Sequence, residues 1–308
     1  MTGFASKMIE RFLSGVRTIA VVCMLMGSVQ AAEIETRIIG GDASTEGSWP
    51  ATVAFLSDNQ FCGGTLVDRR WVVTGAHCLY DSSGKLIPVE KMRILAGSVR
   101  LDSPDLQEIL VTNAFPHPTY SLLGLDYDIA LLELATEAQL PAEPIDLNPV
   151  TPSVGTDATV VGWGVTDVTS STVVTNLREV ILPIVSNETC NAPESYNGMI
   201  TDNMLCAGFA DGGADACFGD SGGPLMVYTD GAWKLTGVVS FGQECALPDK
   251  YGVYMRITSF QNWIRSYIDD SYEPPDSGGG GGGAAGFSIL LFLPWFVFLM
   301  ITGRRRLG

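Results

Sequence analysis

A rhythm of short apolar stretches between turn-forming residues is the feature that most constrains the fold of residues 38–270. Val, Ile, Leu and aromatic residues dominate the stretches ATVAFL, RWVVTGA, DATVVGW, LREVILPI and WKLTGVVSF, and Gly, Pro, Asp and Asn separate them. Short strands with frequent turns are typical of an all-β sandwich or barrel. Only SFQNWIRSYI (259–268) has apolar residues at helical spacing, so we expect a mainly β block that ends in a helix.

The first 37 residues do not continue this pattern. Basic residues precede an apolar run from Ile19 to Met26, and the small residues of SVQAAE follow it. This order is typical of a secretory signal peptide, and the apolar run is too short to span a membrane. We therefore expect residues 1–31 to be a signal peptide that a signal peptidase removes, and the protein to be exported.

The other end of the chain has three short parts. Residues 271–283 form a Gly-rich linker, residues 284–303 are uncharged and mostly apolar, and residues 304–308 contain three arginines. A helix that rises ~1.5 Å per residue over 284–303 is just long enough to cross a hydrocarbon core of ~30 Å. Basic residues favour the cytoplasmic side, so we expect a segment that anchors the exported protein in the inner membrane.

Charge and cysteine content exclude some classes of function. The formal net charge is −16, which argues against a nucleic acid as partner because phosphates require a basic surface. Six cysteines lie outside the signal peptide, and an even number in an exported chain indicates disulfides, although fifteen pairings are possible. The chain has no C-x-x-C motif and only two histidines, so we expect no metal and no cofactor.

Ser221 stands among glycines in DACFGDSGGP (215–224), an arrangement that suits either a surface turn or a nucleophile on a tight bend. A serine nucleophile needs a base, and the candidates are His77 and His117. The motif G-x-S-x-G also fits α/β-hydrolases, but in that fold the histidine follows the serine, and here both histidines precede it. The subtilisin order would require an α/β chain, which the β-rich rhythm disfavours.

Three blocks of sequence resemble the active-site blocks of the trypsin-like (chymotrypsin-fold) serine peptidases. These are TGAHC (74–78), DYDIALLEL (126–134) and DACFGDSGGP. RIIGG, FCGGTLVDRRWVVTGAHC and SFGQECALPDKYGVYMRI extend the resemblance over essentially all of residues 38–270. The family implies an all-β fold of two antiparallel six-stranded β-barrels with a C-terminal helix, and an active site in the cleft between the barrels.

The resemblance assigns roles to the residues around the serine. It implies that Ser221 is the nucleophile, that His77 is the general base and acid, and that Asp128 orients the histidine. The backbone N–H groups of Gly219 and Ser221 are implied to form the oxyanion hole. His117 matches a strand segment of the first barrel, for which we expect a structural role.

A zymogen is also implied. In the family, the aspartate before the serine, here Asp220, binds a new N-terminal ammonium group that is created by cleavage before an Ile-Ile-Gly-Gly sequence. The corresponding bond is Arg37–Ile38, and residues 32–37 would be the activation propeptide. An arginine before the cut bond matches the preference expected of the enzyme itself, which would allow self-activation in trans.

The pocket for the substrate side chain follows from the same resemblance. Asp215, six residues before Ser221, is implied to lie at the pocket floor and to select Arg or Lys. Ala216 replaces a serine of many relatives, which would favour arginine over lysine. Three further residues are implied to form the pocket walls and the strand that pairs with the substrate: Ser240, Gly242 and Gly252. Chymotrypsin-like or elastase-like specificity is the alternative, which Asp215 disfavours.

The family implies the disulfides Cys62–Cys78, Cys190–Cys206 and Cys217–Cys245. Phe241 replaces the usual tryptophan, and Glu244 stands where a glycine is common at the pocket rim, so the subsite preferences stay open. Ser98 and Leu106 occupy positions where carboxylates bind calcium in vertebrate trypsin, so no calcium site is expected.

The tail resembles the GlyGly-CTERM sorting signal of Gram-negative bacteria. In that family a rhomboid-type peptidase removes the tail and type II secretion exports the protein, so we expect a location at the cell surface or outside the cell after transient anchoring. A permanent membrane anchor is the alternative. The sequence thus predicts a monomeric, secreted serine endopeptidase, made as a zymogen, that cleaves after Arg and Lys through an acyl-enzyme; the alternative is a catalytically silent binding protein or adhesin of the same fold.

Overall fold

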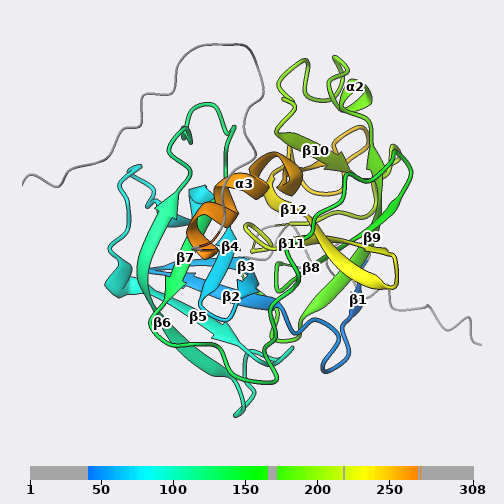
Figure 1. Ribbon diagram of the computed structural model, residues 1–308. Coiled ribbons are helices and arrows are strands. Elements are labelled where there is room, and N and C mark those ends of the chain that lie inside the picture. The colour runs from blue at the N-terminus through cyan, green and yellow to red at the C-terminus, as the bar shows by residue number, and fades with distance from the viewer. Residues whose placement is uncertain (1–40, 166–171, 218, 270, 272–308) are drawn as a thin grey trace, which may run out of the picture. The chain divides into compact units, whose positions relative to one another are not determined.

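The computed structural model describes residues 41–165, 172–217, 219–269 and 271, and these form two barrels of antiparallel strands (Figure 1). The chain divides into two compact units, Met1–Tyr272 and Glu273–Gly308, and every described residue lies in the first. The predicted signal peptide, activation propeptide and apolar tail fall outside the described residues, as does the predicted linker except for Ser271. No helix of the described ranges is long and apolar enough to cross a membrane.

The first barrel is closed by six strands that follow the spatial order β2-β3-β4-β7-β6-β5. Their bounds are β2 Thr52–Ser57, β3 Gln60–Asp68, β4 Trp71–Thr74, β5 Met92–Ala96, β6 Gln107–Pro116 and β7 Ala130–Leu134. Alternation decides which side chains enter the barrel: on β6, Ile109 and Val111 are buried while Leu110 between them is exposed. Two single-turn 3₁₀ helices complete this half, η2 (Ala76–Leu79) after β4 and η3 (Val89–Lys91) before β5.

The second barrel has the order β9-β10-β13-β12-β11-β8, and a pairing between β8 and β9 closes it. Its strands are β8 Asp157–Gly162, β9 Arg178–Val185, β10 Met204–Ala207, β11 Pro224–Thr229, β12 Ala232–Phe241 and β13 Gly252–Arg256. A short additional strand, β1 (Asp42–Ala43), pairs with β9, and a one-turn helix, α2 (Asn187–Cys190), precedes β10. The prediction of two antiparallel six-stranded barrels is confirmed.

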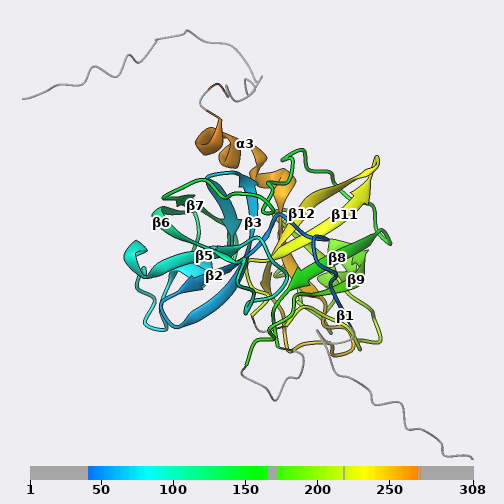
Figure 2. The same ribbon diagram turned by 90° about the horizontal axis from the view of Figure 1, so that it is seen from below.

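The last described helix, α3 (Ile257–Ile268), begins directly after β13 and lies on the side of the barrels away from β1 (Figures 1 and 2). It is amphipathic, and Ile257, Phe260 and Ile264 are its buried residues. Farther along the helix, Tyr267 packs against the first barrel, with its ring 4.9 Å from that of Phe115. The predicted terminal helix is confirmed, and it connects the end of the second barrel to the surface of the first.

Apolar packing and disulfides hold the two halves in place around the site. One buried cluster includes Val73 and Ile129 from the first barrel and Val161 and Trp163 from the second. Among the described residues, disulfides join three pairs: Cys62–Cys78, Cys190–Cys206 and Cys217–Cys245. Such bonds persist mainly in proteins outside the reducing cytosol.

Candidate active site

His77 and Asp128 come from different parts of the first barrel and meet at its edge. His77 lies on η2, just after β4, and Asp128 immediately precedes Ile129 and β7, the strand that pairs with β4. The distance between His77 Nδ1 and Asp128 Oδ2 is 2.7 Å, and the backbone N–H of His77 donates to Asp128 Oδ1 at 2.8 Å. With the ring proton on Nδ1, the Nε2 atom of His77 presents a lone pair, as a general base requires.

The two groups change each other's acidity. Burial lowers the pKa of His77, but the negative charge of Asp128 and their hydrogen bond raise it by more, so the pKa lies above its ordinary value. Burial raises the pKa of Asp128, whose side chain is 0% exposed, but the charge of His77 and hydrogen bonds from His77 and Ser240 bring the pKa below its ordinary value. This environment keeps the carboxylate ionised and stabilises a protonated imidazole.

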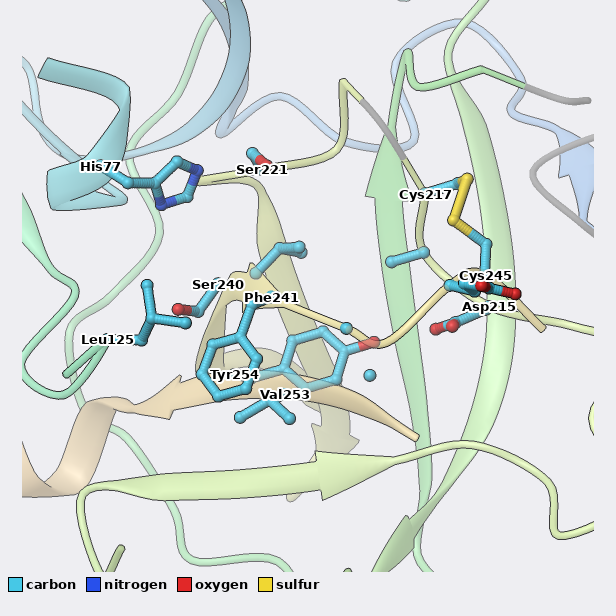
Figure 3. Close-up of a pocket in the computed structure, with 15 residues that line it drawn as sticks. His77, Leu125, Asp215, Cys217, Ser221, Ser240, Phe241, Cys245, Val253 and Tyr254 are labelled. Carbon is cyan, nitrogen blue, oxygen red and sulfur yellow. A yellow bond between two sulfur atoms is a disulfide. The ribbon is translucent and has the colours of Figure 1, made fainter. Parts of the chain in front are cut away.

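Ser221 belongs to the second barrel, in the segment that leads into β11. The N–H of Gly63 on β3 donates to the carbonyl oxygen of Ser221 at 2.7 Å, so the first barrel holds the backbone at the serine. Ser221 and His77 line the same cavity (Figure 3). Within the described residues the Ser221 hydroxyl makes no hydrogen bond to His77; in serine enzymes such a bond often tightens only when substrate is bound.

The bend at Ser221 depends on two glycines with positive φ. Gly219 has φ +95°, and a Cβ there would lie 2.9 Å from Val173 Cγ1. Gly222 has φ +78°, and a Cβ there would lie 2.2 Å from Thr74 Oγ1. The backbone N–H groups of Gly219 and Ser221 donate to no described residue, which is compatible with the predicted oxyanion hole.

A cavity of about 340 Å³ opens beside His77 and Ser221. Figure 3 shows these two side chains at one end of it and Asp215 at the other, beside the Cys217–Cys245 disulfide. Other lining residues come mostly from the segments around β12 and β13: Val239, Ser240, Phe241, Gly242, Glu244, Gly252, Val253 and Tyr254. The cavity is large enough to take one extended side chain, with the serine at its entrance.

Asp215 is the charged group at the far end of this cavity. Its side chain is 3% exposed, its Oδ2 accepts a 3.2 Å hydrogen bond from the N–H of Ala246, and its Oδ1 has no hydrogen-bond partner among the described residues. Burial raises the pKa of Asp215 to about 7. A buried carboxylate oxygen without a donor is stabilised by a cation, which a guanidinium or ammonium group can supply.

Glycines keep the cavity open at two points. A Cβ on Gly252 would lie 2.9 Å from Oδ1 of Asp215, so any larger residue would push against the carboxylate. A Cβ on Gly242 would meet nothing closer than 3.9 Å, the distance to Tyr196 Oη. Ala216 also lines the cavity, where it contributes a methyl group and no hydroxyl.

Asp220 lies in a separate buried position behind the serine. Its carboxylate accepts hydrogen bonds from the N–H groups of Gly164 (2.8 Å) and Cys217 (2.9 Å), and burial raises its pKa to about 6. A Cβ on Gly162 would lie 2.1 Å from Asp220 Oδ1, so the carboxylate fits against a surface of glycines. Arg37 and Ile38, the predicted cleavage point, lie outside the described residues.

Some residues of the site carry no local sequence signal. Ser240, which the sequence places on the substrate-pairing strand, also donates a hydrogen bond to Asp128. Leu125 lines the cavity from the loop before Asp128, and nothing in the sequence marks it. His117 stacks on Tyr127 with ring centroids 4.9 Å apart and is packed among aromatic side chains, away from the cavity lining.

The chemistry of the donors disfavours a metal ion at the candidate group of ligand atoms that the described residues contain. In the described part of the chain, the one group of three close metal-ligand atoms comprises Cys62, His77 and Cys78. The two sulfur atoms form a disulfide, so neither is a thiolate ligand.

Comparisons with known proteins agree with this architecture. The family model described as Trypsin matches residues 38–264. Trypsin of Xenopus laevis is 37% identical over 254 residues, which cover 82% of this chain and 98% of that protein. The chain belongs to the trypsin family of serine peptidases.

Two further relatives are longer than this chain. Transmembrane protease serine 5 of Homo sapiens is 38% identical over 263 residues, which cover 82% of this chain and 56% of the relative. Hepatocyte growth factor activator serine proteases of Canis lupus familiaris is 35% identical over 254 residues, which cover 79% of this chain and 38% of the relative. The chain therefore spans about half the length of the first of these relatives and less of the second.

Proposed function

We propose that this chain is a secreted serine endopeptidase, made as an inactive precursor, that cleaves peptide bonds after arginine and less readily after lysine. The observation that carries the specificity is the buried carboxylate of Asp215, whose Oδ1 has no partner among the described residues, at the end of a cavity that begins beside Ser221. A bound guanidinium would supply two donors to this carboxylate, and the methyl group of Ala216 offers nothing to a lysine ammonium.

The catalytic steps follow from the positions of three side chains. The Nε2 atom of His77 accepts the proton of Ser221 as the serine Oγ attacks the carbonyl carbon of the substrate. The N–H groups of Gly219 and Ser221 stabilise the negative charge on the carbonyl oxygen. His77 then donates its proton to the departing amine, which leaves an acyl-enzyme, and a water molecule repeats the sequence to release the acid. Asp128 holds the imidazole throughout.

The precursor state rests on Asp220. In this proposal cleavage of Arg37–Ile38 creates an ammonium group that pairs with the buried Asp220 carboxylate and orders the loops around Ser221. Burial of an unpaired carboxylate costs several kcal/mol, so the partner favours the ordered site. Residues 1–31 would be the signal peptide, 32–37 the propeptide and 38–270 the peptidase domain.

The ends of the chain complete the proposal. Residues 284–303 would hold the new protein in the inner membrane of a Gram-negative bacterium, with the basic tail of residues 304–308 in the cytoplasm. Removal within the Gly-rich linker by a rhomboid-type peptidase, followed by type II secretion, would place the enzyme at the cell surface or outside the cell. The disulfides of the described residues support an exported protein.

Hydrolysis of chromogenic amides tests the proposed activity. The precursor is first cut at Arg37–Ile38 by an added peptidase, which is then removed, and rates are measured on arginine, lysine, phenylalanine and alanine amides. We expect the hydrolysis rate to be highest for the arginine amide, lower for the lysine amide, and much lower for the phenylalanine and alanine amides. Fast hydrolysis of the phenylalanine or alanine amide would contradict the specificity. Hydrolysis of none of them by fully cleaved protein would favour a catalytically silent binding protein.

A further inference from the structure

Glu244 places a second carboxylate on the cavity that holds Asp215. Both residues line the cavity, and no lysine or arginine is among its described lining residues. Asp215 is buried at the far end, whereas Glu244 is exposed at the rim, next to Cys245 of the Cys217–Cys245 disulfide. The cavity therefore offers one buried negative charge to the side chain that enters it and a second negative charge where its lining is exposed to solvent.

The backbone fixes where this second charge lies. Glu244 has φ +58°, a left-handed conformation that glycine adopts freely and a glutamate rarely does. On its C-terminal side, Cys245 is held by its disulfide, and Ala246 donates from its N–H to Asp215 and accepts from Gly213 N–H at 2.9 Å. Residues in such conformations concentrate at functional sites, where the surrounding structure holds them.

The Glu244 carboxylate is available to a ligand. It makes no hydrogen bond or ion pair with the described residues. The lysine of the same loop, Lys250, donates to the carbonyl oxygens of Glu194 and Ser195. A positive charge at the rim must therefore come from outside this loop.

The geometry of an extended peptide indicates which substrate residue brings that charge. Alternate side chains of an extended chain point to the same side and lie ~7 Å apart along it. When the arginine before the cleaved bond enters the cavity, the side chain two positions earlier faces the same side of the peptide. An arginine in the cavity therefore directs the side chain two positions earlier toward the face of the enzyme on which the cavity opens.

We infer that Glu244 is a specificity-determining residue that favours Arg or Lys two positions before the cleaved arginine and disfavours Asp or Glu there. This inference rests on the proposed function, because it assumes that an arginine occupies the cavity. The enzyme thus selects substrates with two basic residues in alternate positions.

The chain's own predicted activation sequence conflicts with this preference. Residues 32–37 read AEIETR, so Glu35 stands two positions before Arg37. Glu244 and Glu35 carry the same charge, and their repulsion slows cleavage of the precursor by its own mature form. Activation then depends on another peptidase, in place of the self-activation that Arg37 alone would allow.

Three peptides with a C-terminal reporter amide test the inference. They carry the sequence of residues 32–37 with Glu, Gln or Lys at the position of Glu35, and each is given to the wild-type enzyme and to the Glu244→Gln, Glu244→Gly and Glu244→Lys variants. Rates are expressed per active site, counted with an irreversible serine-directed phosphonate. This count corrects for any variant that folds poorly, and the Glu244→Gly variant relieves the left-handed backbone.

For the wild type we expect kcat/KM to increase from the Glu to the Gln to the Lys peptide, by about fivefold to tenfold in total at low salt. The differences in kcat/KM between the three peptides should largely disappear in Glu244→Gln and Glu244→Gly and should change sign in Glu244→Lys. Added salt should make these differences smaller. Asp249→Asn is the matched control, since Asp249 is an exposed acid of the same loop with φ +58° that does not line the cavity. It should keep the wild-type order.

Two results would overturn the inference. The first is equal rates on the three peptides by the wild type, which would leave the arginine specificity intact. The second is an unchanged order in Glu244→Gln, which would assign the preference to another residue. If the enzyme cleaves neither the three peptides nor a simple arginine amide, the result would instead refute the proposed function on which the inference rests.

Discussion

Ser240 on β12 donates a 2.5 Å hydrogen bond from its Oγ to Oδ2 of Asp128, the same carboxylate oxygen that contacts His77 Nδ1. The two residues belong to different barrels, so the second barrel helps to orient a carboxylate of the first. Asp128 is fully buried and receives its hydrogen bonds from Ser240 and from both the side chain and the backbone of His77. Its orientation therefore depends on how the barrels face each other.

Replacement of Ser240 tests this contact. Ser240→Ala removes a donor to a buried charge, which is worth ~1.5–3 kcal/mol, so we expect kcat on an arginine amide to fall about tenfold or more. The pKa of Asp128 should increase, because one of the bonds that lower it is lost. Ser195→Ala is the control: its buried hydroxyl has no hydrogen-bond partner among the described residues, so kcat should not change. Equal losses in both variants would contradict the role of Ser240.

Removal of the serine nucleophile tests the mechanism. Ser221→Ala should lower kcat on the order of a million-fold, because the members of such a triad act as a unit. The variant should keep the wild-type melting temperature and should still be cut at Arg37–Ile38 by an added peptidase. Comparable activity in this variant would refute the proposed acyl-enzyme.

The charge at the end of the cavity should decide specificity. We expect Asp215→Ser to lower kcat/KM for arginine amides, which corresponds to a loss of several kcal/mol in transition-state stabilisation. The kcat/KM values for apolar amides should change little. The reason is that the guanidinium loses its buried counter-ion. Rates on the two classes of amide decide the point, and an equal loss on both would indicate a folding defect.

The same variant should change stability with pH. The folded protein raises the pKa of Asp215 to about 7, whereas an unfolded chain has an aspartate pKa of ~3.9. The folded state thus binds the proton more tightly, and stability falls as pH rises through this interval. In an inactive Ser221→Ala background, Asp215→Ser should stabilise the protein by about 4 kcal/mol above pH ~7 and change little below pH ~4. Urea unfolding at both pH values measures this, and a constant difference would contradict it.

The N-terminus of the active enzyme should be Ile38. Sequencing of active material would identify it, and an active form that begins at Ala32 would contradict the zymogen proposal.

Asp220→Asn should lower the activity of correctly cut enzyme by about 100-fold or more, since the new ammonium group loses its buried partner. Gly162 and Gly164 contact the Asp220 carboxylate, so the isosteric asparagine avoids the steric conflict that a larger residue would cause.

The C-terminus of the extracellular enzyme should lie in the glycine run. Glycine disfavours a helix, so we expect the run of glycines at 278–283 to be open to a peptidase, and Pro294 within the predicted apolar segment would help an intramembrane peptidase. Mass spectrometry of the secreted protein should find an end between residues 278 and 286. A mature protein that retains RRRLG would favour the permanent anchor.

Local patterns made the fold predictable. The stretches ATVAFL, RWVVTGA, DATVVGW, LREVILPI and WKLTGVVSF coincide largely with β2, β4, β8, β9 and β12, since alternation and turn residues act over a few positions. The strand β1 was not predicted, because two residues carry no period and only the pairing with β9 makes them a strand. The helix α3 begins two residues earlier than its apolar spacing indicates, at Ile257 directly after β13.

The candidate site was predictable only as far as short motifs reach. The sequence has only two histidines, so few residues are candidates for the general base. The motif around Ser221 predicts the nucleophile. The roles of these residues stay predictions. The Ser240–Asp128 bond spans 112 positions and the bond from Asn203 Nδ2 to Asp126 spans 77. Both join the two barrels, and no local pattern encodes how two barrels face each other.

The pairing of β1 with β9 sets Asp42 opposite Glu179. It therefore fixes the chain four residues after Ile38, the predicted new N-terminus. Four residues reach at most ~14 Å, so a new amino group at Ile38 would stay within that radius of Asp42. One group in such a volume corresponds to an effective concentration on the order of 0.1 M. A tether this short makes capture of the amine an event within one molecule, so the fraction of cut protein that becomes active should not vary with dilution.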